Sequence, residues 1–278
     1  MTAKALLIPR SADEAVGLLA EHGPDLVVMG GGTVVMEQVN DGHLFPRVVM
    51  SLRRAGMDAV RHVNGHVEIG ATASAAQLAA LDSLPPLAQA ADILGGPAVR
   101  TMATIGGNLV VAPPYGDLAV PLLALDAEVE LAGPDGRRTL PLAQFLAERP
   151  TTVAPRELVT LVRAPRPRGR TAYLKYGRRE ANTPSVVAVA VHVVIGGDGT
   201  CHDARVALGA AGPTALRART AEAALAGQSL DEGTIAATTE AAMADCDPST
   251  DALATAWYRR KMVGVYVRRA LERVAHAG

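Results

Sequence analysis

Residues 99–109 read VRTMATIGGNL. Most of them belong to a longer segment, residues 95–108, that is rich in turn-forming residues. Thr104 and Asn108 flank the Gly-Gly pair, so the loop combines a flexible backbone with a hydroxyl and an amide. One such loop is an ordinary turn. Two such loops, with their backbone amides facing one another, could bind a single diphosphate, because neutral donors do this without burying an unpaired cation.

A second glycine-rich loop lies earlier in the chain. Residues 25–29 (Asp-Leu-Val-Val-Met) predict a buried strand, which residues 30–33 (Gly-Gly-Gly-Thr) end. Glycines let backbone N–H groups approach an anion, which favours a phosphate-binding loop, and a tight turn between strand and helix is the alternative. The loop is a poor dinucleotide-binding fingerprint because Val35 stands where a third glycine is expected. No Gly-Lys-Ser/Thr follows it, so it is not a P-loop either.

The pattern along the chain predicts an α+β protein of two domains. Up to about residue 163 helices and strands are mixed, and Ser11 with Glu14 and Ser74 with Gln77 form capping boxes. Asn64-Gly65 predicts a hairpin turn. Proline, glycine and arginine alternate over residues 164–170, which we interpret as the domain boundary. The expected elements beyond it are strands at 171–176, 186–195 and 204–208 and helices at 220–226, 231–244 and 250–275.

In the last of these helices, Thr250 is the expected cap. Its apolar stripe is expected to face the core rather than a cofactor. The stripe consists of Trp257, Val263, Val267 and Leu271.

The composition of the 278 residues excludes several classes of function. The net charge of −1 argues against a polyanion-binding surface, and 3% aromatic residues argue against a base-stacking platform. Two cysteines cannot form a four-thiolate iron–sulfur site. The sequence shows neither an apolar run of about 18 residues nor a secretion signal. We therefore expect a cytoplasmic protein that binds no nucleic acid and does not span a membrane.

Two further patterns are weaker. His62 and His66 have the spacing of metal ligands on a helix, but the turn between them predicts a hairpin, so we expect no metal site. We also find no pattern of catalytic acid, base or nucleophile. Seven basic residues without an intervening acid indicate either a docking patch for an acidic partner or a solvated linker. They are Arg163, Arg166, Arg168, Arg170, Lys175, Arg178 and Arg179.

The two loops together resemble those of the flavoprotein subunit of molybdenum hydroxylases, which include carbon monoxide dehydrogenase (medium subunit) and xanthine dehydrogenase (FAD domain). The family's first loop reads Ala/Gly-Gly-Gly-Thr/Gln-Asp/Ser-Leu, and residues 29–34 are similar to it, with Val34 replacing the polar residue. Its second motif reads Val/Ile-Arg-Asn-x-Gly-Thr-Ile-Gly-Gly-Asn-Leu, then a Pro and an Asp. Residues 99–109 with Pro114 and Asp117 are similar to that motif, and the resemblance covers nearly the whole chain.

The resemblance implies noncovalent FAD and a role for each matching residue. Backbone donors of the first loop would line the ADP side, and Thr104 to Asn108 would hold the pyrophosphate and ribityl chain. Leu94 and the backbone of Val159 would contact the flavin. Asp117 would accept hydrogen bonds from cofactor hydroxyls, unless it is a helix cap, and Lys175 would raise the flavin potential, unless it is a solvated strand residue. The implied set is Val28, Met29, Gly30, Gly31, Gly32, Thr33, Val34, Leu94, Thr101, Thr104, Gly106, Gly107, Asn108, Asp117, Val159 and Lys175.

The resemblance also implies the architecture and the partners. Residues 1–168 would form an FAD-binding domain with a small α/β lobe (about 1–55) and an α+β lobe with an antiparallel sheet (56–168). Residues 169–278 would form a smaller domain of a three-stranded antiparallel sheet with helices. The chain would pass electrons from the [2Fe–2S] clusters of a small subunit, beside a molybdopterin-binding large subunit, to an external acceptor. A self-contained FAD oxidoreductase and a flavin-free scaffold are the alternatives.

The chain departs from the family pattern near the expected flavin. Pro113 and Tyr115 replace smaller or polar residues, and residues 182–185 contain no aromatic side chain that could cover the ring. Tyr115 or Tyr176 are the candidates for that cover.

Overall fold

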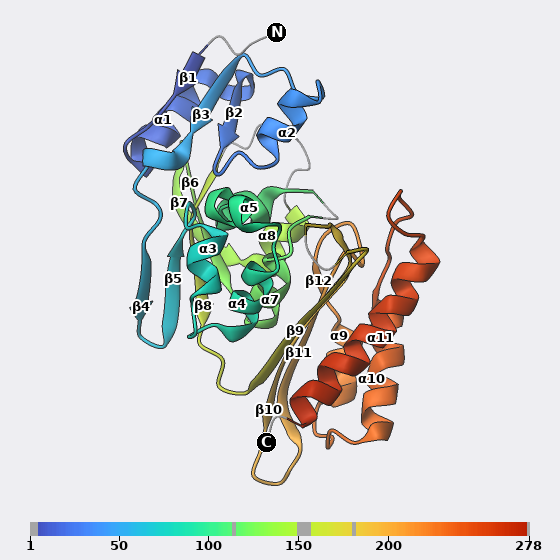
Figure 1. Ribbon diagram of the computed structural model, residues 1–278. Coiled ribbons are helices and arrows are strands. Elements are labelled where there is room, and N and C mark those ends of the chain that lie inside the picture. Colours follow the sequence, from blue (N-terminus) through green and yellow to red (C-terminus); the bar gives the residue numbers. More distant parts are fainter. Residues whose placement is uncertain (1–4, 113–114, 149–156, 180–181, 277–278) are drawn as a thin grey trace.

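The computed structural model describes residues 5–112, 115–148, 157–179 and 182–276. Pro113 and Pro114 lie outside this range. Within it, three sheets organise the chain (Figure 1). The first is a parallel sheet in the order β1-β3-β2, formed by β1 (Ala5–Leu7), β2 (Leu26–Met29) and β3 (Val48–Ser51).

The helix α1 (Ala12–His22) packs on the parallel sheet through Ala15 and Leu19. Ser11 caps it by accepting a hydrogen bond from the amide of Glu14 (3.1 Å). The Glu14 carboxylate accepts from the amide of Arg10 instead of Ser11, so the predicted capping box is only half formed. This unit is the predicted small α/β lobe.

A five-stranded antiparallel sheet forms the second lobe, in the order β4-β5-β8-β6-β7. Asn64 and Gly65 have φ values of 47° and 80°, as a two-residue hairpin turn between β4 and β5 requires, which confirms the predicted turn. The strands are β4 (Val60–Val63), β5 (His66–Gly70), β6 (Glu128–Gly133), β7 (Gly136–Pro141) and β8 (Leu158–Pro165).

Short helices pack against this sheet and form the largest apolar cluster with it. Residues 95–108, which read as turn-rich, form two of these helices, because Pro97 occupies the first turn of one and Thr104 caps the other. Ser74 and Gln77 form the complete predicted capping box. The helices are α3 (Ala75–Ala79), α4 (Pro85–Asp92), α5 (Pro97–Met102), α6 (Ile105–Val110), α7 (Ala119–Ala124) and α8 (Leu142–Glu148).

The C-terminal part contains the three predicted antiparallel strands and a two-residue fourth, in the order β12-β11-β10-β9. Along β10 the side chains alternate, so that Val187 and Val189 face one apolar core and Ala188 and Ala190 face the other. The strands are β9 (Arg170–Gly177), β10 (Ser185–Ile195), β11 (Cys201–Gly209) and β12 (Leu216–Arg217).

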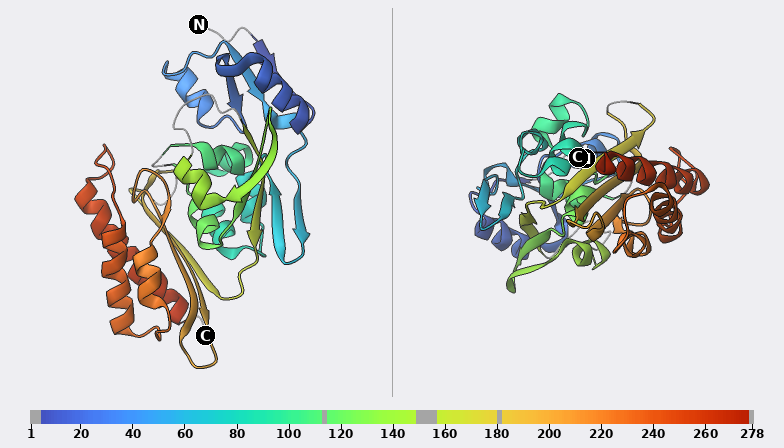
Figure 2. Two further views of the ribbon diagram at one scale, coloured as in Figure 1. Left: turned by 180° about the vertical axis from the view of Figure 1, so that it is seen from behind. Right: turned by 90° about the horizontal axis from the view of Figure 1, so that it is seen from below.

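Three helices cover the outer face of this sheet, and α4 and α7 pack against its inner face (Figures 1 and 2). The three outer helices are α9 (Arg219–Leu225), α10 (Glu232–Asp245) and α11 (Ala256–Ala275). The predicted start of the last helix was wrong: Thr255 caps it, and Thr250 accepts a hydrogen bond from the amide of Ala256 (2.9 Å).

The apolar stripe of α11 was also predicted wrongly at one position. Val263, Val267 and Leu271 are buried as expected, but the Trp257 side chain is 69% exposed. Arg259, two residues later, is the residue that faces the sheet. Since residues two apart point to opposite sides of a helix, Trp257 faces outward.

Candidate cofactor site

The structure brings the two glycine loops into direct contact. A Cβ atom added at Gly31 would lie 1.7 Å from the carbonyl oxygen of Met102, and one added at Gly30 would lie 2.6 Å from Oγ1 of Thr104. No side chain fits at such distances, so only glycine allows this approach. The two segments, far apart in the sequence, therefore lie in direct contact.

The first loop has free backbone donors. It follows β2 and leads through Gly32, which has a φ of 76°, into α2 (Val35–Asn40). Within the described chain, none of the amides of residues 30–33 donates a hydrogen bond to a backbone or side-chain acceptor. These donors, with the Thr33 hydroxyl, form a set suited to an anion.

Residues 105–108 of the second loop have already used their backbone donors. The amide of Ile105 donates to the carbonyl of Ala73 (3.0 Å), and that of Gly106 to the carbonyl of Ala71 (2.9 Å). The amide of Gly107 donates to Oγ1 of Thr104 (3.2 Å), and the amide of Asn108 to the Thr104 carbonyl (2.9 Å). Within the described chain, the donors that remain for a ligand are the amide and the hydroxyl hydrogen of Thr104 and the NH₂ group of Asn108.

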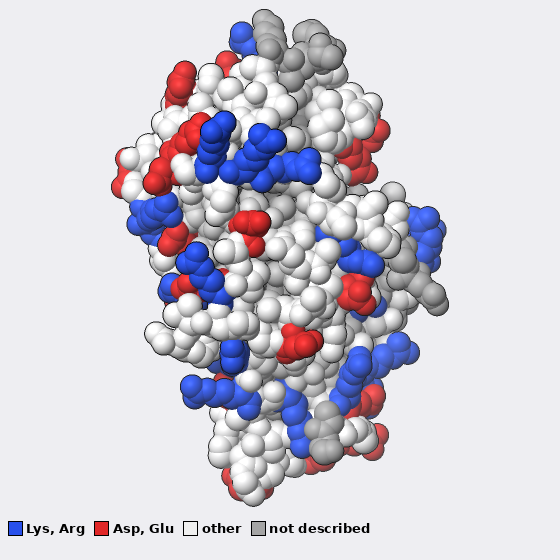
Figure 3. Space-filling view, turned by 60° about the vertical axis from the view of Figure 1, so that its left-hand side comes forward, with Lys and Arg blue, Asp and Glu red and all other residues white. Residues whose placement is uncertain are grey.

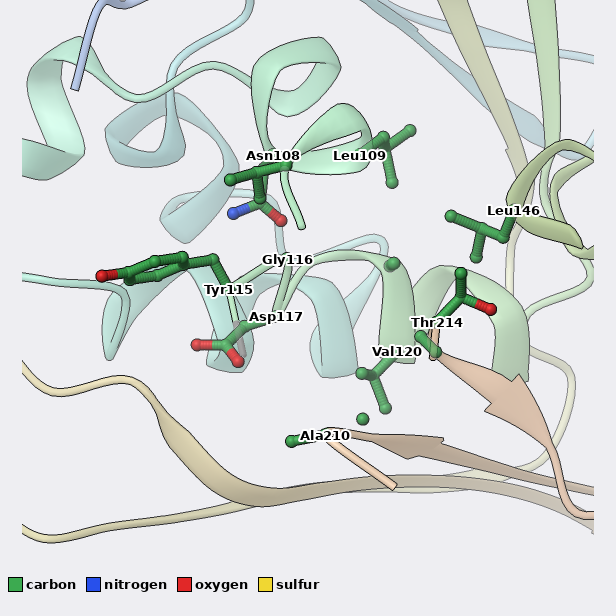
Figure 4. A pocket seen from close by; sticks show the side chains of 13 residues that line it. Asn108, Leu109, Tyr115, Gly116, Asp117, Val120, Leu146, Ala210 and Thr214 are labelled. Carbon is green, nitrogen blue, oxygen red and sulfur yellow. The ribbon is translucent and has the colours of Figure 1, made fainter. Parts of the chain in front are cut away.

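Asn108 connects the second loop with a buried ion pair. Its Oδ1 accepts a hydrogen bond from the amide of Leu118 (2.9 Å), the residue after Asp117 (Figure 4). The Asp117 carboxylate accepts from Nζ of Lys175 (2.6 Å) and from Oγ of Ser185 (2.5 Å). The Lys175 side chain is only 8% exposed, so it is not a solvated strand lysine. Nor is Asp117 a helix cap, because its carboxylate is committed to these two partners.

Two tyrosines lie near Asp117: Tyr173 is within range of its charge, and Tyr115 lines the same pocket. Burial, and next the charge of Asp117, raises the pKa of the Tyr173 phenol well above its ordinary value. Burial also raises the pKa of Tyr115, with a contribution from the charge of Glu37 on α2. Tyr115 is therefore within electrostatic range of the small lobe, across the junction of the two loops. Tyr176 instead stacks on Tyr266 of α11 and shares a hydroxyl contact with Tyr258 (3.1 Å).

Exposed apolar side chains surround the loop junction. Met36, Met102, Val110 and Tyr115 are 44%, 38%, 51% and 46% exposed. A pocket with an empty volume of about 370 Å³, open mouth included, lies next to Asn108, Tyr115 and Asp117 (Figure 4). Free amides, neutral polar side chains and exposed apolar surface together fit a large cofactor with a diphosphate and a ring system.

The other residues implied by the resemblance lie at different depths. Leu94 and Val159 belong to the apolar cluster beneath the second loop, whereas Val28 packs against the core of the small lobe. The Thr101 hydroxyl donates to the carbonyl of Ala98 (2.9 Å) within α5. Sequence reasoning missed Ser185, whose one signal is that it is a polar residue at the start of an otherwise apolar strand.

A second ionic cluster lies at the other end of α7. Asp126 accepts hydrogen bonds from Arg205 and Arg217 of the C-terminal sheet. Arg217 also donates to Glu222, and Arg205 contacts His192 (3.1 Å). Burial and the charge of Arg205 lower the pKa of His192, the burial effect being larger. Both ends of α7 thus carry an acid that binds cations of the C-terminal part.

The weaker sequence patterns form no site. His62 contacts Arg166 (2.7 Å) and His66 contacts the carbonyl of Asn64 (3.1 Å), and the described residues contain no cluster of metal-ligating side chains. The basic run is dispersed, because Arg163 pairs with Glu68 while Lys175 pairs with Asp117. On the face in Figure 3 basic and acidic side chains are interspersed. No helix in the described part of the chain has both the length and the hydropathy needed to cross a membrane.

Comparison with known proteins places the chain in a family. Residues 2–167 match the family described as "FAD binding domain in molybdopterin dehydrogenase", and residues 172–274 match "CO dehydrogenase flavoprotein C-terminal domain". The 6-hydroxypseudooxynicotine dehydrogenase complex subunit alpha of Paenarthrobacter nicotinovorans is 30% identical over 97% of this chain and 94% of its own length. The carbon monoxide dehydrogenase medium chain of Afipia carboxidovorans is 31% identical over 95% of this chain and 94% of its own.

Solved structures agree with the sequence matches. A chain of reconstituted CO dehydrogenase from Oligotropha carboxidovorans superposes with a TM-score of 0.93 at 30% identity, covering 100% of this chain and 99% of that one. A chain of the Hydrogenophaga pseudoflava carbon monoxide dehydrogenase gives a TM-score of 0.92 at 32% identity, covering 98% and 97%. The chain belongs to the FAD-binding flavoprotein family of the molybdopterin dehydrogenases.

Proposed function

We propose that the chain is the electron-transfer subunit of a multi-subunit molybdenum hydroxylase. It would receive electrons from the [2Fe–2S] clusters of a small partner subunit and pass them to an external acceptor, while a molybdopterin-binding large subunit oxidises the substrate. The observation that carries this proposal is the contact of Gly30 and Gly31 with residues 102–104, which joins free backbone donors to the second loop. The medium chains and complex subunits among its relatives support it.

The diphosphate of FAD would be held mainly by the first loop. The free amides of residues 30–33 and the Thr33 hydroxyl would donate to its oxygens, and Thr104 and Asn108 would add side-chain donors. Met29, Val34, Gly106 and Gly107 would shape the cradle. Such donors compensate a diphosphate without a buried arginine or lysine beside it.

Lys175 and Asp117 would lie at the flavin end. The ammonium of Lys175 is 2.6 Å from the Asp117 carboxylate, so the pair as a whole is neutral, and the amine is held at a fixed position. Leu94 and Val159 would supply apolar contacts, and Tyr115 remains the candidate for covering the ring. Tyr176 is the weaker candidate, because it is engaged with α11.

FAD exchanges electrons singly or in pairs, the chemistry that connects one-electron iron–sulfur centres with two-electron acceptors. The chain's own task is to bind the cofactor, to fix a charge pair beside it and to exclude water. We infer the domain division at residues 168 and 169, which is supported by family matches that end at residue 167 and resume at residue 172.

The test is FAD loading followed by partner capture. Purified protein should be yellow and should gain about 2.7 kcal/mol of stability when free FAD reaches about 100 times its dissociation constant. A colourless protein that FAD does not stabilise contradicts the proposal and indicates a flavin-free scaffold.

Partner capture separates the remaining alternatives. A tagged chain should co-purify with one subunit that contains molybdenum and one that contains iron. Turnover of a small substrate by the FAD-loaded chain alone would instead identify a self-contained oxidoreductase.

A further inference from the structure

The strand β10 begins with a bulge. Ser185 is paired with Gly177 of β9, but Val187 is paired with Tyr176, so the register shifts by one residue at Val186. A bulge leaves backbone groups outside the ladder and changes the direction in which a neighbouring side chain points. Here the neighbouring side chain is that of Ser185, whose hydroxyl donates to Asp117.

Arg259 of α11 binds the carbonyl groups of this bulge. Its Nη1 donates to the carbonyls of Ser185 (3.2 Å) and Val186 (2.8 Å). Its Nη2 donates to both carboxylate oxygens of Asp251 (2.9 and 2.8 Å). The Arg259 side chain is only 2% exposed, and the planar guanidinium fixes the angle between its two ends.

These contacts form a continuous series from a surface loop to the ion pair. Asp251 orients Arg259, Arg259 fixes the bulge, the bulge directs Ser185 to Asp117, and Asp117 holds Lys175. Burial tends to raise the pKa of the Asp251 carboxyl, but the hydrogen bonds from Arg259 and from the amides of Ala254 and Leu253 together outweigh it and lower that pKa. Four of these links are hydrogen bonds, and the link from the bulge to the Ser185 hydroxyl is covalent.

We propose that Arg259 is a positioning residue for Lys175: by fixing the bulge at Val186, it sets where the lysine ammonium stands. Among the hydrogen bonds of the described residues, Arg259 is linked to Lys175 through Ser185 and Asp117. The consequence for bound FAD rests on the function proposed above, and the consequence for Lys175 does not. If Arg259 only fastened α11 to the sheet, its substitution would lower the stability of the protein but would leave Lys175 where it is.

The experiment observes Lys175 directly. The chain has three lysines, Lys4, Lys175 and Lys261, so protein labelled with ¹⁵N at the lysine Nζ gives three side-chain signals. Ser185→Ala should move the Lys175 signal, and Arg259→Met should move it in the same direction. The double variant should move it no further than the larger single change, because both substitutions break one series of contacts.

Two further variants complete the test. Arg260→Met is the matched control, because Arg260 is the next residue of α11 but donates to the carbonyl of Cys246 (2.9 Å), away from the bulge, and it should leave the Lys175 signal in place. Asp251→Asn keeps the guanidinium but weakens its anchor, and should move the signal less, in the same direction.

The proposal is overturned if folded Arg259→Met protein shows the Lys175 signal at its wild-type position, or if the two single effects add in the double variant. If Arg259→Met does not fold, Asp251→Asn decides, and an unmoved signal overturns the proposal. In FAD-loaded protein, Ser185→Ala and Arg259→Met should shift the reduction potential in the same direction. Wild-type protein that binds no FAD would refute the proposed function, while the lysine signal would still test the role of Arg259.

Discussion

The two glycine loops look alike in sequence and differ in what they leave free. Residues 30–33 pack against residues 102–104 and keep their amides unused within the described chain, whereas residues 105–108 donate theirs to the fold. The absence of a side chain at Gly31 permits the approach of another backbone segment. At Gly106 it permits the approach of Ala71, whose carbonyl oxygen would lie 2.9 Å from an added Cβ. A glycine pair therefore indicates a close approach, but the partner of that approach is decided by the tertiary structure.

The largest effect is expected for Gly31→Ala. The new Cβ would lie 1.7 Å from a backbone oxygen, which cannot move without separating the loops. We expect loss of FAD binding and a fall in unfolding free energy of more than about 3 kcal/mol. The measurements are the flavin absorbance per protein and chemical denaturation.

Gly96→Ala is the matched control for this prediction. A Cβ at Gly96 meets nothing within 4 Å, and its φ of −92° suits any residue. Wild-type FAD content in Gly31→Ala would mean that the close contact of the two loops is unnecessary for the site.

Asp117→Asn tests how much the buried ion pair beside the second loop contributes to stability. The substitution leaves the Lys175 ammonium buried without its carboxylate, and breaking a buried pair costs about 3 kcal/mol. The uncompensated cation should also raise the reduction potential of bound FAD. Urea denaturation and spectroelectrochemical titration measure the two effects.

The acid at the other end of α7 provides the comparison. The Asp126 side chain is 48% exposed, so Asp126→Asn should cost only about 1 kcal/mol and leave the potential unchanged. Equal losses in the two variants would show that the burial of the Asp117 pair has no special energetic role.

Thr104→Val separates the hydroxyl from the shape of the second loop. The change removes the cap of α6, which costs about 1 kcal/mol, and one donor that we assign to the diphosphate. We expect FAD affinity to fall roughly tenfold, equivalent to about 1.4 kcal/mol. Thr101→Val is the control, because that hydroxyl is already bonded within α5, and equal losses of affinity would contradict the assignment.

The smallest effect is expected for Gly107→Ala. Its Cβ would lie 2.9 Å from Oγ1 of Thr104, a side-chain atom that a small shift can accommodate while it keeps its hydrogen bond from the Gly107 amide, and alanine favours the helix. Stability should change by less than about 1 kcal/mol with FAD retained. A loss as large as that of Gly31→Ala, measured by the same assays, would remove the distinction between the loops.

Local sequence patterns predicted much of the fold. The Asn64-Gly65 turn and the Ser74–Gln77 capping box depend on neighbouring residues and formed as expected. The helices of residues 97–110 did not follow from local pattern, because glycine and proline there serve helix starts and a close packing contact. Trp257 was misassigned because it lies two residues before Arg259, which faces the sheet, so that its own side chain points outward.

The candidate site was less accessible to sequence reasoning. The adjacency of the loops was expected from the family resemblance, whereas the unequal use of their amides depends on the acceptors Ala71 and Ala73 in another segment. Asp117 and Lys175 are 58 positions apart, and nothing in the sequence around either residue indicates that they pair. The roles of Ser185 and Arg259 became visible only with the bulge in β10. The sequence of one strand does not determine a bulge, because the register depends on how two strands pair.

The buried helix α7 has a mechanical consequence. All six of its residues are buried, and an acid at each end is bonded to the C-terminal sheet. Separating the C-terminal sheet from the rest of the molecule would expose the face of α7 that packs on the sheet and would break the ion pairs of both acids together. We therefore expect the junction of α7 and the C-terminal sheet to stay closed when other parts of the molecule open locally.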